Sequence, residues 1–244
     1  MPANKIELVE INFYSDGLNL SGTLHLPAVD HPPAVIGSHG LYSNRESPKQ
    51  IALARACNAL GMAYFRFDHR GCGSSQGEFE QVTSLTARCT DLKNAVEAIN
   101  SRPEVGHRIG LFGSSMGGTV CLRVARELEV TTVVTFAAPL CSRIDDVGLK
   151  RSKEHDTPGI FLDPAKSNFN ISENVRQVNN ILIIHGQMDE TVPLSHAEEI
   201  YCLAGDPKKL IVQQNGDHRM SDENHQTDFI REASLWFKAG LISP

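Results

Sequence analysis

The chain has 244 residues, of which 41% are hydrophobic and 21% charged, and its formal net charge is -6 at pH 7. This composition is ordinary for a globular protein and argues against a disordered or fibrous chain. The negative charge repels polyanions, and the short basic cluster at 150–153 has no interleaved aromatic residues, so we expect no nucleic-acid partner. We expect residues 1–244 to form a single domain, since α/β folds of this length commonly do.

The first two elements are expected to form a hairpin. Hydrophobic and polar residues alternate over 5–15 and again over 19–26, and such alternation is typical of strands with one buried face. Asp16 and Gly17 lie between the two segments. Both residue types tolerate the positive φ of a tight turn, so we expect the turn there.

Short apolar segments then alternate with segments of helical periodicity. Continuous apolar runs are typical of buried parallel strands, and apolar residues three or four positions apart indicate one face of a helix. With the hairpin, the alternation predicts an α/β fold with a mostly parallel, eight-stranded sheet and helices on both faces. The predicted strands are 34–38, 62–67, 108–112, 131–137, 180–184 and 208–213, and the predicted helices are 48–60, 84–100, 116–128, 194–203 and 223–238.

One segment, at about 139–179, is roughly twice as long as a single crossover helix requires, and we expect no strand in it. We interpret it as a small cap insertion whose apolar residues, Phe161 among them, cover a substrate pocket. The alternative is a surface insertion that packs its own small core, because long loops are often but not always functional.

A catalytic motif lies between the predicted strand 108–112 and the predicted helix 116–128. Residues 113–117 have the sequence GSSMG, which matches G-x-S-x-G and places Ser115 in a sharp strand-to-helix turn. Glycine two residues on either side lets the two backbones approach closely. The motif predicts Ser115 as a nucleophile. The alternative is a glycine-rich turn used for packing, or for binding an anion at the helix N-terminus.

A serine nucleophile needs a base, and the base needs an acid that holds its imidazole in one tautomer. Asp189 follows the predicted strand 180–184, and His218 follows the last predicted strand. Their loops lie at the carboxyl edge of the sheet, where open α/β sheets bind ligands. The order serine, aspartate, histidine is the one this architecture requires, so we predict a triad of Ser115, Asp189 and His218.

Other residues compete for the roles of acid and base. Glu190 and Asp217 each flank a catalytic candidate and are the alternative acids. Asp217 adjoins His218, and neighbouring side chains of an extended segment point apart, which disfavours it. Three further histidines are alternative bases: His185 in the loop before the predicted acid, and His196 and His225 at or inside predicted helices.

Acyl transfer also needs donors for the oxyanion, and in this type of site they are backbone amides. Met116, directly after the nucleophile, supplies the first amide. The early strand 34–38 ends in His39, Gly40 and Leu41, and glycine would let the chain turn the Leu41 amide inward. Tyr42 is the alternative second donor, and we expect His39 to be structural.

The cysteines and the N-terminal residues indicate the cellular compartment in which the protein is expected. The cysteines are scattered without metal-ligand spacing, so we expect free thiols and no metal site. The N-terminal segment has acidic residues where a secretory signal needs a basic start and an apolar run, so we expect the cytoplasm. No apolar run approaches the roughly 18 residues of a membrane-spanning helix, so we expect no integral membrane association. The six cysteines are Cys57, Cys72, Cys89, Cys121, Cys141 and Cys202.

With these residues in hand, the sequence resembles the α/β-hydrolase superfamily, and within it the branch of serine aminopeptidase-like hydrolases, monoacylglycerol lipases and cinnamoyl or feruloyl esterases. The resemblance covers nearly the whole chain and implies the α/β-hydrolase fold. It implies a structural role for the turn that begins at Asp68 and a variable cap at 139–179. The matching segments are SHGLYSN, FRFDHRGCGSSQGEF, GLFGSSMGG, ILIIHGQMDETVP and NGDHR.

The predicted function is that of a serine hydrolase, a carboxylesterase acting on small to medium acyl or aryl esters without metal or cofactor. Alternatives with the same triad are a thioesterase, a short-peptide or amide hydrolase, an acyltransferase and a carbon-carbon bond hydrolase. A non-catalytic ligand-binding scaffold is the alternative of another class, and the residues leave open whether the protein is a monomer or a homodimer. A haloalkane dehalogenase or epoxide hydrolase is disfavoured, because those relatives carry aspartate at the position of Ser115. The residues expected to contact substrate are Leu41, Tyr42, Leu140 and Phe161.

Overall fold

The computed structural model describes residues 6–142 and 168–242. It opens with the predicted hairpin, in which β1 (Glu7–Ser15) pairs antiparallel with β2 (Leu18–Leu26). Asp16 and Gly17 form the two-residue turn with φ of 48° and 79°. Positive φ at both central positions matches the right-handed twist of the strands, so the hairpin prediction is confirmed.

The predicted eight-stranded, mostly parallel sheet is also confirmed. Its order is β1-β2-β4-β3-β5-β6-β9-β10. Only the pairs β1 with β2 and β2 with β4 are antiparallel, and the remaining neighbours run parallel. The six parallel strands are β3 (Ala34–Ser38), β4 (Ala63–Phe67), β5 (Ile109–Ser114), β6 (Thr132–Phe136), β9 (Ile181–Gly186) and β10 (Lys208–Gln213).

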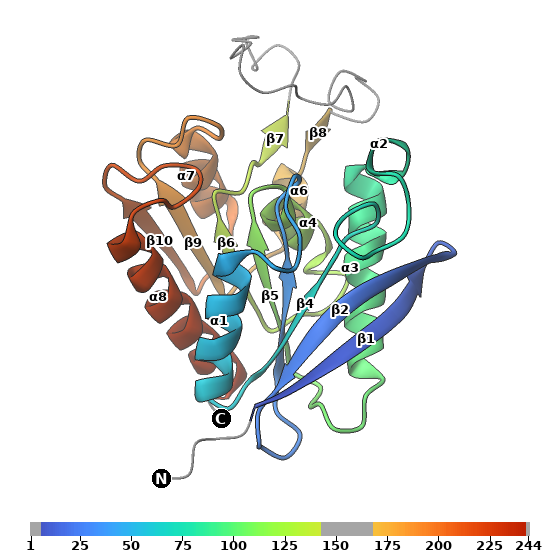
Figure 1. The fold of residues 1–244 in the computed structure, drawn as a ribbon. Helices are drawn as coiled ribbons and strands as arrows, with labels where there is room; N and C mark the ends of the chain where they lie inside the picture. The colour runs from blue at the N-terminus through green and yellow to red at the C-terminus, as the bar shows by residue number, and fades with distance from the viewer. Residues whose placement is uncertain (1–5, 143–167, 243–244) are drawn as a thin grey trace.

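Helices cover both faces of the sheet (Figure 1). Helices α1 and α8 lie side by side on one face, while α3, α4, α6 and α7 pack on the other. The helices are α1 (Pro48–Ala59), α2 (Phe79–Val82), α3 (Leu85–Asn100), α4 (Met116–Val124), α6 (Ser172–Val175), α7 (Leu194–Leu203) and α8 (Glu223–Leu241).

Local capping fixes where the two longest helices begin. The Ser84 side chain accepts a hydrogen bond from the amide of Ala87 at the start of α3. The Asp222 carboxylate accepts from the amides of Asn224 and His225 at the start of α8. These side chains satisfy backbone donors that the first helical turn leaves without partners.

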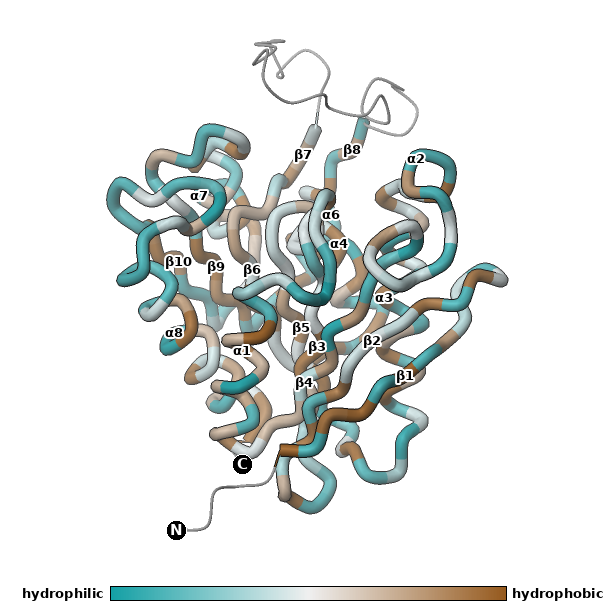
Figure 2. Tube along the Cα trace, viewed as in Figure 1, coloured by the Kyte–Doolittle hydropathy of each residue, from teal (hydrophilic) through white to brown (hydrophobic). Residues whose placement is uncertain are grey.

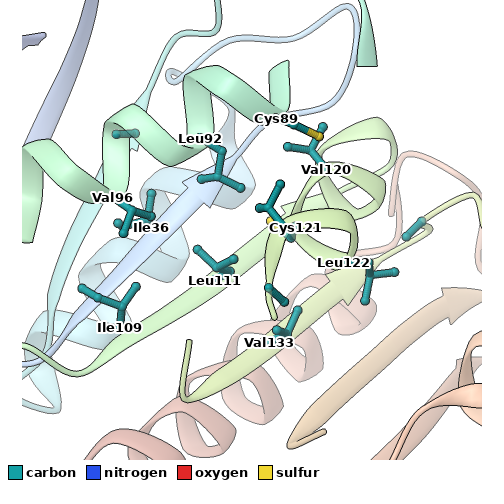
Figure 3. Close-up of a cluster of buried hydrophobic side chains, with 14 of the residues drawn as sticks. Ile36, Cys89, Leu92, Val96, Ile109, Leu111, Val120, Cys121, Leu122 and Val133 are labelled. Atoms are coloured by element: carbon teal, nitrogen blue, oxygen red, sulfur yellow. The ribbon is translucent and has the colours of Figure 1, made fainter. Parts of the chain in front are cut away.

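Two hydrophobic clusters form the core, one on each face of the sheet. Hydrophobic residues follow the central strands, and hydrophilic residues predominate in the exposed loops (Figure 2). Apolar burial of this kind is the main favourable term in folding. Figure 3 shows part of the cluster between the sheet and helices α3 and α4, with Ile36, Cys89, Leu92, Val96, Ile109, Leu111, Val120, Cys121, Leu122 and Val133 labelled.

The ends of the predicted cap segment differ from expectation. Cys141–Ser142 (β7) and Phe169–Asn170 (β8) pair as a short antiparallel ladder where no strand was expected, and α6 follows directly. The sequence-based prediction was wrong here because two residues are too few for an alternating pattern to be recognised. The central part of the cap, with Phe161, lies outside the described residues.

None of the helices among residues 6–142 and 168–242 is both long and apolar enough to span a bilayer.

Candidate active site

Ser115 lies in the turn between β5 and α4, with φ of 51° and ψ of -125°. Positive φ is uncommon for a residue with a side chain and marks a strained turn. The flanking glycines make this turn possible. A Cβ on Gly113 would lie 2.4 Å from the Gly117 carbonyl oxygen, and one on Gly117 would lie 2.1 Å from the Ser38 carbonyl oxygen. Both distances are shorter than real Cβ contacts, so a side chain at either position would force the elements apart.

His218 lies against Ser115, although 103 residues separate them in the sequence. Its Nε2 is 3.1 Å from Ser115 Oγ, and its Nδ1 is 2.8 Å from Asp189 Oδ2. With the carboxylate accepting from Nδ1–H, Nε2 is left as the acceptor for the serine hydroxyl. The arrangement can withdraw a proton from Ser115, which is the first requirement of nucleophilic catalysis.

Asp189 follows β9, and its side chain is fully buried. Its Oδ1 accepts from the amides of Thr191 and Val192 at 2.9 and 2.7 Å, while Oδ2 faces His218. Two amides on one oxygen fix the rotation of the carboxylate and leave the other oxygen for the imidazole. The site thus holds the imidazole in one tautomer and one orientation.

The two alternative acids have other partners. Both Asp217 oxygens accept from Ser221, one from its amide at 2.8 Å and one from its hydroxyl at 2.6 Å. Glu190 Oε2 lies 3.4 Å from the backbone amide of His218. Neither carboxylate hydrogen-bonds to the imidazole ring, which instead pairs with Asp189.

His185 was expected in the loop before Asp189, and this expectation was wrong. The residue belongs to strand β9, is fully buried, and lies with Nε2 2.8 Å from the Val192 carbonyl oxygen and 3.4 Å from Asp189 Oδ2. The strand continues to Gly186, two residues beyond its apolar run. The polar imidazole can be buried there because it has a carbonyl partner inside the protein. Burial lowers the pKa of His185 below its ordinary value, which keeps the ring neutral behind the carboxylate.

The two predicted oxyanion amides belong to the residue directly after Ser115 and to the loop that follows β3. Met116 is the first residue of α4, so its amide is one of the donors that a helix N-terminus leaves free. Gly40, which precedes Leu41, approaches the nucleophile so closely that a Cβ built on it would lie 3.6 Å from the Ser115 Cβ. Within residues 6–142 and 168–242, neither the Leu41 nor the Met116 amide donates to a protein acceptor.

The residues predicted to contact substrate differ in how deeply they are buried. Leu41 is partly buried against the core, and Tyr42 is 56% exposed with its ring 5.5 Å from that of Phe79 on α2. Leu140 packs inside the hydrophobic core, with only 1% of its surface exposed. The structure therefore brings Leu41 and Tyr42 to the loop beside the nucleophile, and Leu140 beneath the surface.

The turn beginning at Asp68 is hydrogen-bonded to the loop between β3 and α1 and to the segment at Ser74. Asp68 Oδ1 accepts from the Arg45 amide at 2.7 Å, and Oδ2 accepts from the Ser74 amide at 3.0 Å. The Ser75 hydroxyl donates to the Asp68 carbonyl oxygen at 2.6 Å. Gly73 has φ of +53°, and a Cβ there would lie 2.3 Å from Asp68 Oδ2. These contacts are those of a structural turn that fixes the β3–α1 loop beside the site.

Lys49 holds the loop that carries His218, a contact that sequence reasoning missed. Its Nζ donates to the Arg219 carbonyl oxygen at 3.1 Å and lies 4.5 Å from the centre of the Phe136 ring. Burial lowers the pKa of Lys49 to about 8, against the opposing effect of the negative charges of Asp217 and Asp189. The 170 residues between Lys49 and Arg219 explain why no sequence pattern signals the pair.

This pKa predicts a pH-dependent contribution to stability. In the unfolded chain Lys49 keeps its proton to about pH 10.4, whereas the folded protein releases it near pH 8. Between these values the unfolded state binds more protons, so this group makes the free energy of unfolding rise with pH. Urea denaturation from pH 7.5 to 10.5 should show this rise in the wild type relative to Lys49→Met. Parallel profiles of the two proteins would contradict the assignment.

The chain is similar to one protein family and to several curated proteins. The family described as serine aminopeptidase, S33, matches residues 30–155. The uncharacterized protein YfhR of Escherichia coli O157:H7 is 30% identical over 181 residues, which cover 74% of this chain and 61% of that protein. The mitochondrial palmitoyl-protein thioesterase ABHD10 of Homo sapiens is 26% identical over 216 residues, covering 78% and 68%. The chain thus spans about three fifths of the length of YfhR.

Solved structures with similar folds include two esterases. Est1E from Butyrivibrio proteoclasticus with bound ferulic acid has a TM-score of 0.79 and 20% identity, covering 96% of this chain and all of that one. The Pyrococcus furiosus esterase Pf2001 has a TM-score of 0.79 and 21% identity, with coverages of 97% and 92%. At these identities the similarity concerns the fold.

Proposed function

The chain belongs to the serine aminopeptidase S33 family and has the α/β-hydrolase fold, and from this premise we propose that it is a serine carboxylesterase. Its substrates in this proposal are small to medium acyl or aryl esters. The observation that carries the proposal is the hydrogen-bonded series from Ser115 through His218 to the buried Asp189. A buried carboxylate, an oriented imidazole and a strained serine together form the arrangement that activates a hydroxyl group.

In the proposed reaction, Ser115 Oγ attacks the ester carbonyl while its proton passes to His218 Nε2. The Leu41 and Met116 amides stabilise the resulting oxyanion. Collapse of this intermediate breaks the bond to the leaving alcohol, which takes the proton from the imidazolium. Water then attacks the acyl-enzyme, again giving a proton to His218, and the carboxylic acid leaves as Ser115 regains its hydrogen.

We place the acyl or aryl group against the loop after β3. Leu41 and Tyr42 supply apolar surface there, and the ring of Phe79 lies 5.5 Å from that of Tyr42. Aromatic rings give a ligand large apolar contact at a low cost in side-chain entropy. Leu140 is buried in the core, and the predicted contact with Phe161 lies outside the described residues.

A thioesterase is the second candidate, because relatives covering 78% of the chain are named palmitoyl-protein thioesterases. The same triad and oxyanion amides serve both reactions, since only the leaving group differs. A thioesterase of this kind would favour long acyl chains and thiol leaving groups.

A substrate panel separates the candidates. Initial rates are measured with acetyl, butyryl, octanoyl and palmitoyl esters of p-nitrophenol, the matching acyl thioesters, and the matching anilides. The proposal expects the highest kcat/KM with a short or medium ester and low rates with the anilides. Preference for the palmitoyl thioester would favour the second candidate, and hydrolysis of no substrate would favour a non-catalytic binding protein.

Three further expectations belong to the proposal. We propose that residues 1–244 act as one domain, that the partner is a small molecule and not a nucleic acid, and that the protein works in the cytoplasm. The six cysteines are all free, and four of them are buried, which suits a reducing compartment. Size-exclusion chromatography with light scattering distinguishes the monomer from the homodimer.

A further inference from the structure

Arg88 is a buried arginine without a carboxylate partner. It lies on α3, has no exposed surface, and is the largest fully buried side chain of the described residues. Among these residues no acidic group lies within ion-pairing distance of its guanidinium, because the nearby Asp91 pairs with Arg70 and His69. Burying an arginine without a counter-ion is costly, so the groups that do contact it require an explanation.

Those groups belong to a single loop. Arg88 Nη2 donates to the carbonyl oxygens of His39 at 2.9 Å and Gly40 at 3.2 Å. Nη1 donates to the carbonyl oxygen of Leu41 at 3.3 Å. Three consecutive carbonyls of the loop after β3 therefore point towards one guanidinium, whose fixed, planar donors can hold several acceptors at once.

His39 strengthens the same contact. Its Nδ1 is 2.7 Å from the Gly40 carbonyl oxygen, and its Nε2 accepts from the backbone amide of His69 at 3.1 Å. The second contact makes Nε2 the acceptor, so Nδ1 carries the hydrogen and donates to Gly40. Burial, with the nearby charge of Arg88, holds the pKa of His39 well below its usual value. The Gly40 carbonyl thus has two donors, Arg88 and a neutral His39.

The orientation of this carbonyl determines the direction of the Leu41 amide. The carbonyl of Gly40 and the N–H of Leu41 belong to one planar, trans peptide group, in which the two bonds point in opposite directions. With the Gly40 carbonyl held by Arg88, the Leu41 N–H points to the other side of the loop. A Cβ built on Gly40 would lie 3.6 Å from the Ser115 Cβ, so the loop is packed directly against the nucleophile.

We propose that Arg88 is a positioning residue that orients the Leu41 amide towards the oxyanion formed at Ser115. This role rests on the proposed hydrolytic function. The guanidinium fixes the peptide before substrate binds, and a cation hydrogen-bonded to the carbonyl polarises the N–H of the same peptide. Preorganised donors of this kind are effective because they need no reorganisation during the reaction.

Two variants test the proposal against a matched control. Arg88→Lys keeps a charge but loses the forked donors, and Arg88→Met removes both. The control is Arg70→Lys, which changes another buried arginine whose side chain contacts Asp91, Ser15 and Asp16 and not the loop. We expect kcat for a p-nitrophenyl ester to fall roughly 10-fold in Arg88→Lys and roughly 100-fold in Arg88→Met, as for a misplaced or lost oxyanion donor. KM should stay near the wild-type value, because the ground-state contacts remain.

The control should retain its kcat, so that loss of stability alone is distinguished from loss of orientation. Folded Arg88 variants with the same kcat as Arg70→Lys would overturn the proposal. A second measurement does not need activity: the amide resonance of Leu41 in protein labelled with 15N-leucine, assigned by its absence in Leu41→Ile. A shifted resonance in Arg88→Lys, but not in Arg70→Lys, supports the orienting role even if the wild type hydrolyses no ester, and an unshifted one contradicts it.

Discussion

Ser115→Ala is expected to lower kcat/KM for a p-nitrophenyl ester by about 10⁶-fold while the protein remains folded. In the proposed reaction the hydroxyl forms the acyl-enzyme, and its Oγ lies 3.1 Å from His218 Nε2. Alanine retains the Cβ and removes one atom, so the strained turn at φ of 51° is retained. Residual hydrolysis would come from the oxyanion amides and binding alone. Steady-state kinetics and circular dichroism measure the two effects.

Ser114→Ala is the matched control for this substitution. Ser114 is the last residue of β5 and is paired with Phe136, one position before the turn. Its replacement removes the same atom from the same motif without touching His218, so activity should stay close to that of the wild type. If Ser114→Ala abolished turnover while Ser115→Ala retained it, the nucleophile would have been assigned to the wrong serine.

Asp189→Asn is expected to reduce kcat by about 10⁴-fold, as when the corresponding acid of a serine-protease triad becomes an amide. Asn presents an N–H group or an amide oxygen where the carboxylate now accepts from His218 Nδ1. The imidazole then favours the tautomer that places its hydrogen on Nε2, and that nitrogen no longer accepts the serine proton. Since this defect concerns the chemical step, KM should change little. Kinetics with saturating ester separate kcat from KM.

Two carboxylates provide controls at the same edge of the sheet. Asp217→Asn changes a group bound to Ser221, and Glu190→Gln changes a group near the backbone amide of His218. Both side chains are sequence neighbours of the triad, yet neither contacts the imidazole ring. We expect both variants to lose far less activity than Asp189→Asn. A larger loss in either one would identify it as the acid.

The sheet could be predicted because each parallel strand is a short apolar run between polar turns. The strand 208–213 was predicted with the bounds that the structure shows. The position of Ser115 could be predicted because the close approach of β5 and α4 leaves room only for glycine at 113 and 117. These steric limits act between residues close together in the sequence, so they produce a recognisable sequence motif.

Other features produce no clear sequence pattern, because they are very short or depend on residues elsewhere in the chain. The β7–β8 ladder has two residues in each strand, too few for a period to be seen. His185 continues β9 although it is polar, because its partner Val192 is seven residues further along the chain. The pairing of Lys49 with the Arg219 carbonyl depends on the start of helix α1 and a distant loop, which meet only in the folded protein.

The sequence position of Arg88 is itself unusual. It lies three residues after Leu85 and four before Leu92, and both leucines belong to the buried face of α3. A charged residue within an apolar stripe is expected to have a specific buried partner. The sequence could therefore mark Arg88 as unusual, while the identity of its partners, three carbonyls of one loop, required the structure.

The central claim is that Ser115 is an activated nucleophile, and intact mass after incubation with a fluorophosphonate tests it most directly. The account predicts one covalent adduct on the wild type, none on Ser115→Ala, and an undiminished adduct on Ser114→Ala. Short and medium acyl esters should slow labelling of the wild type by competing for the site. A wild type that stays unlabelled, or a Ser115→Ala variant that labels as fast as the wild type, would contradict the claim.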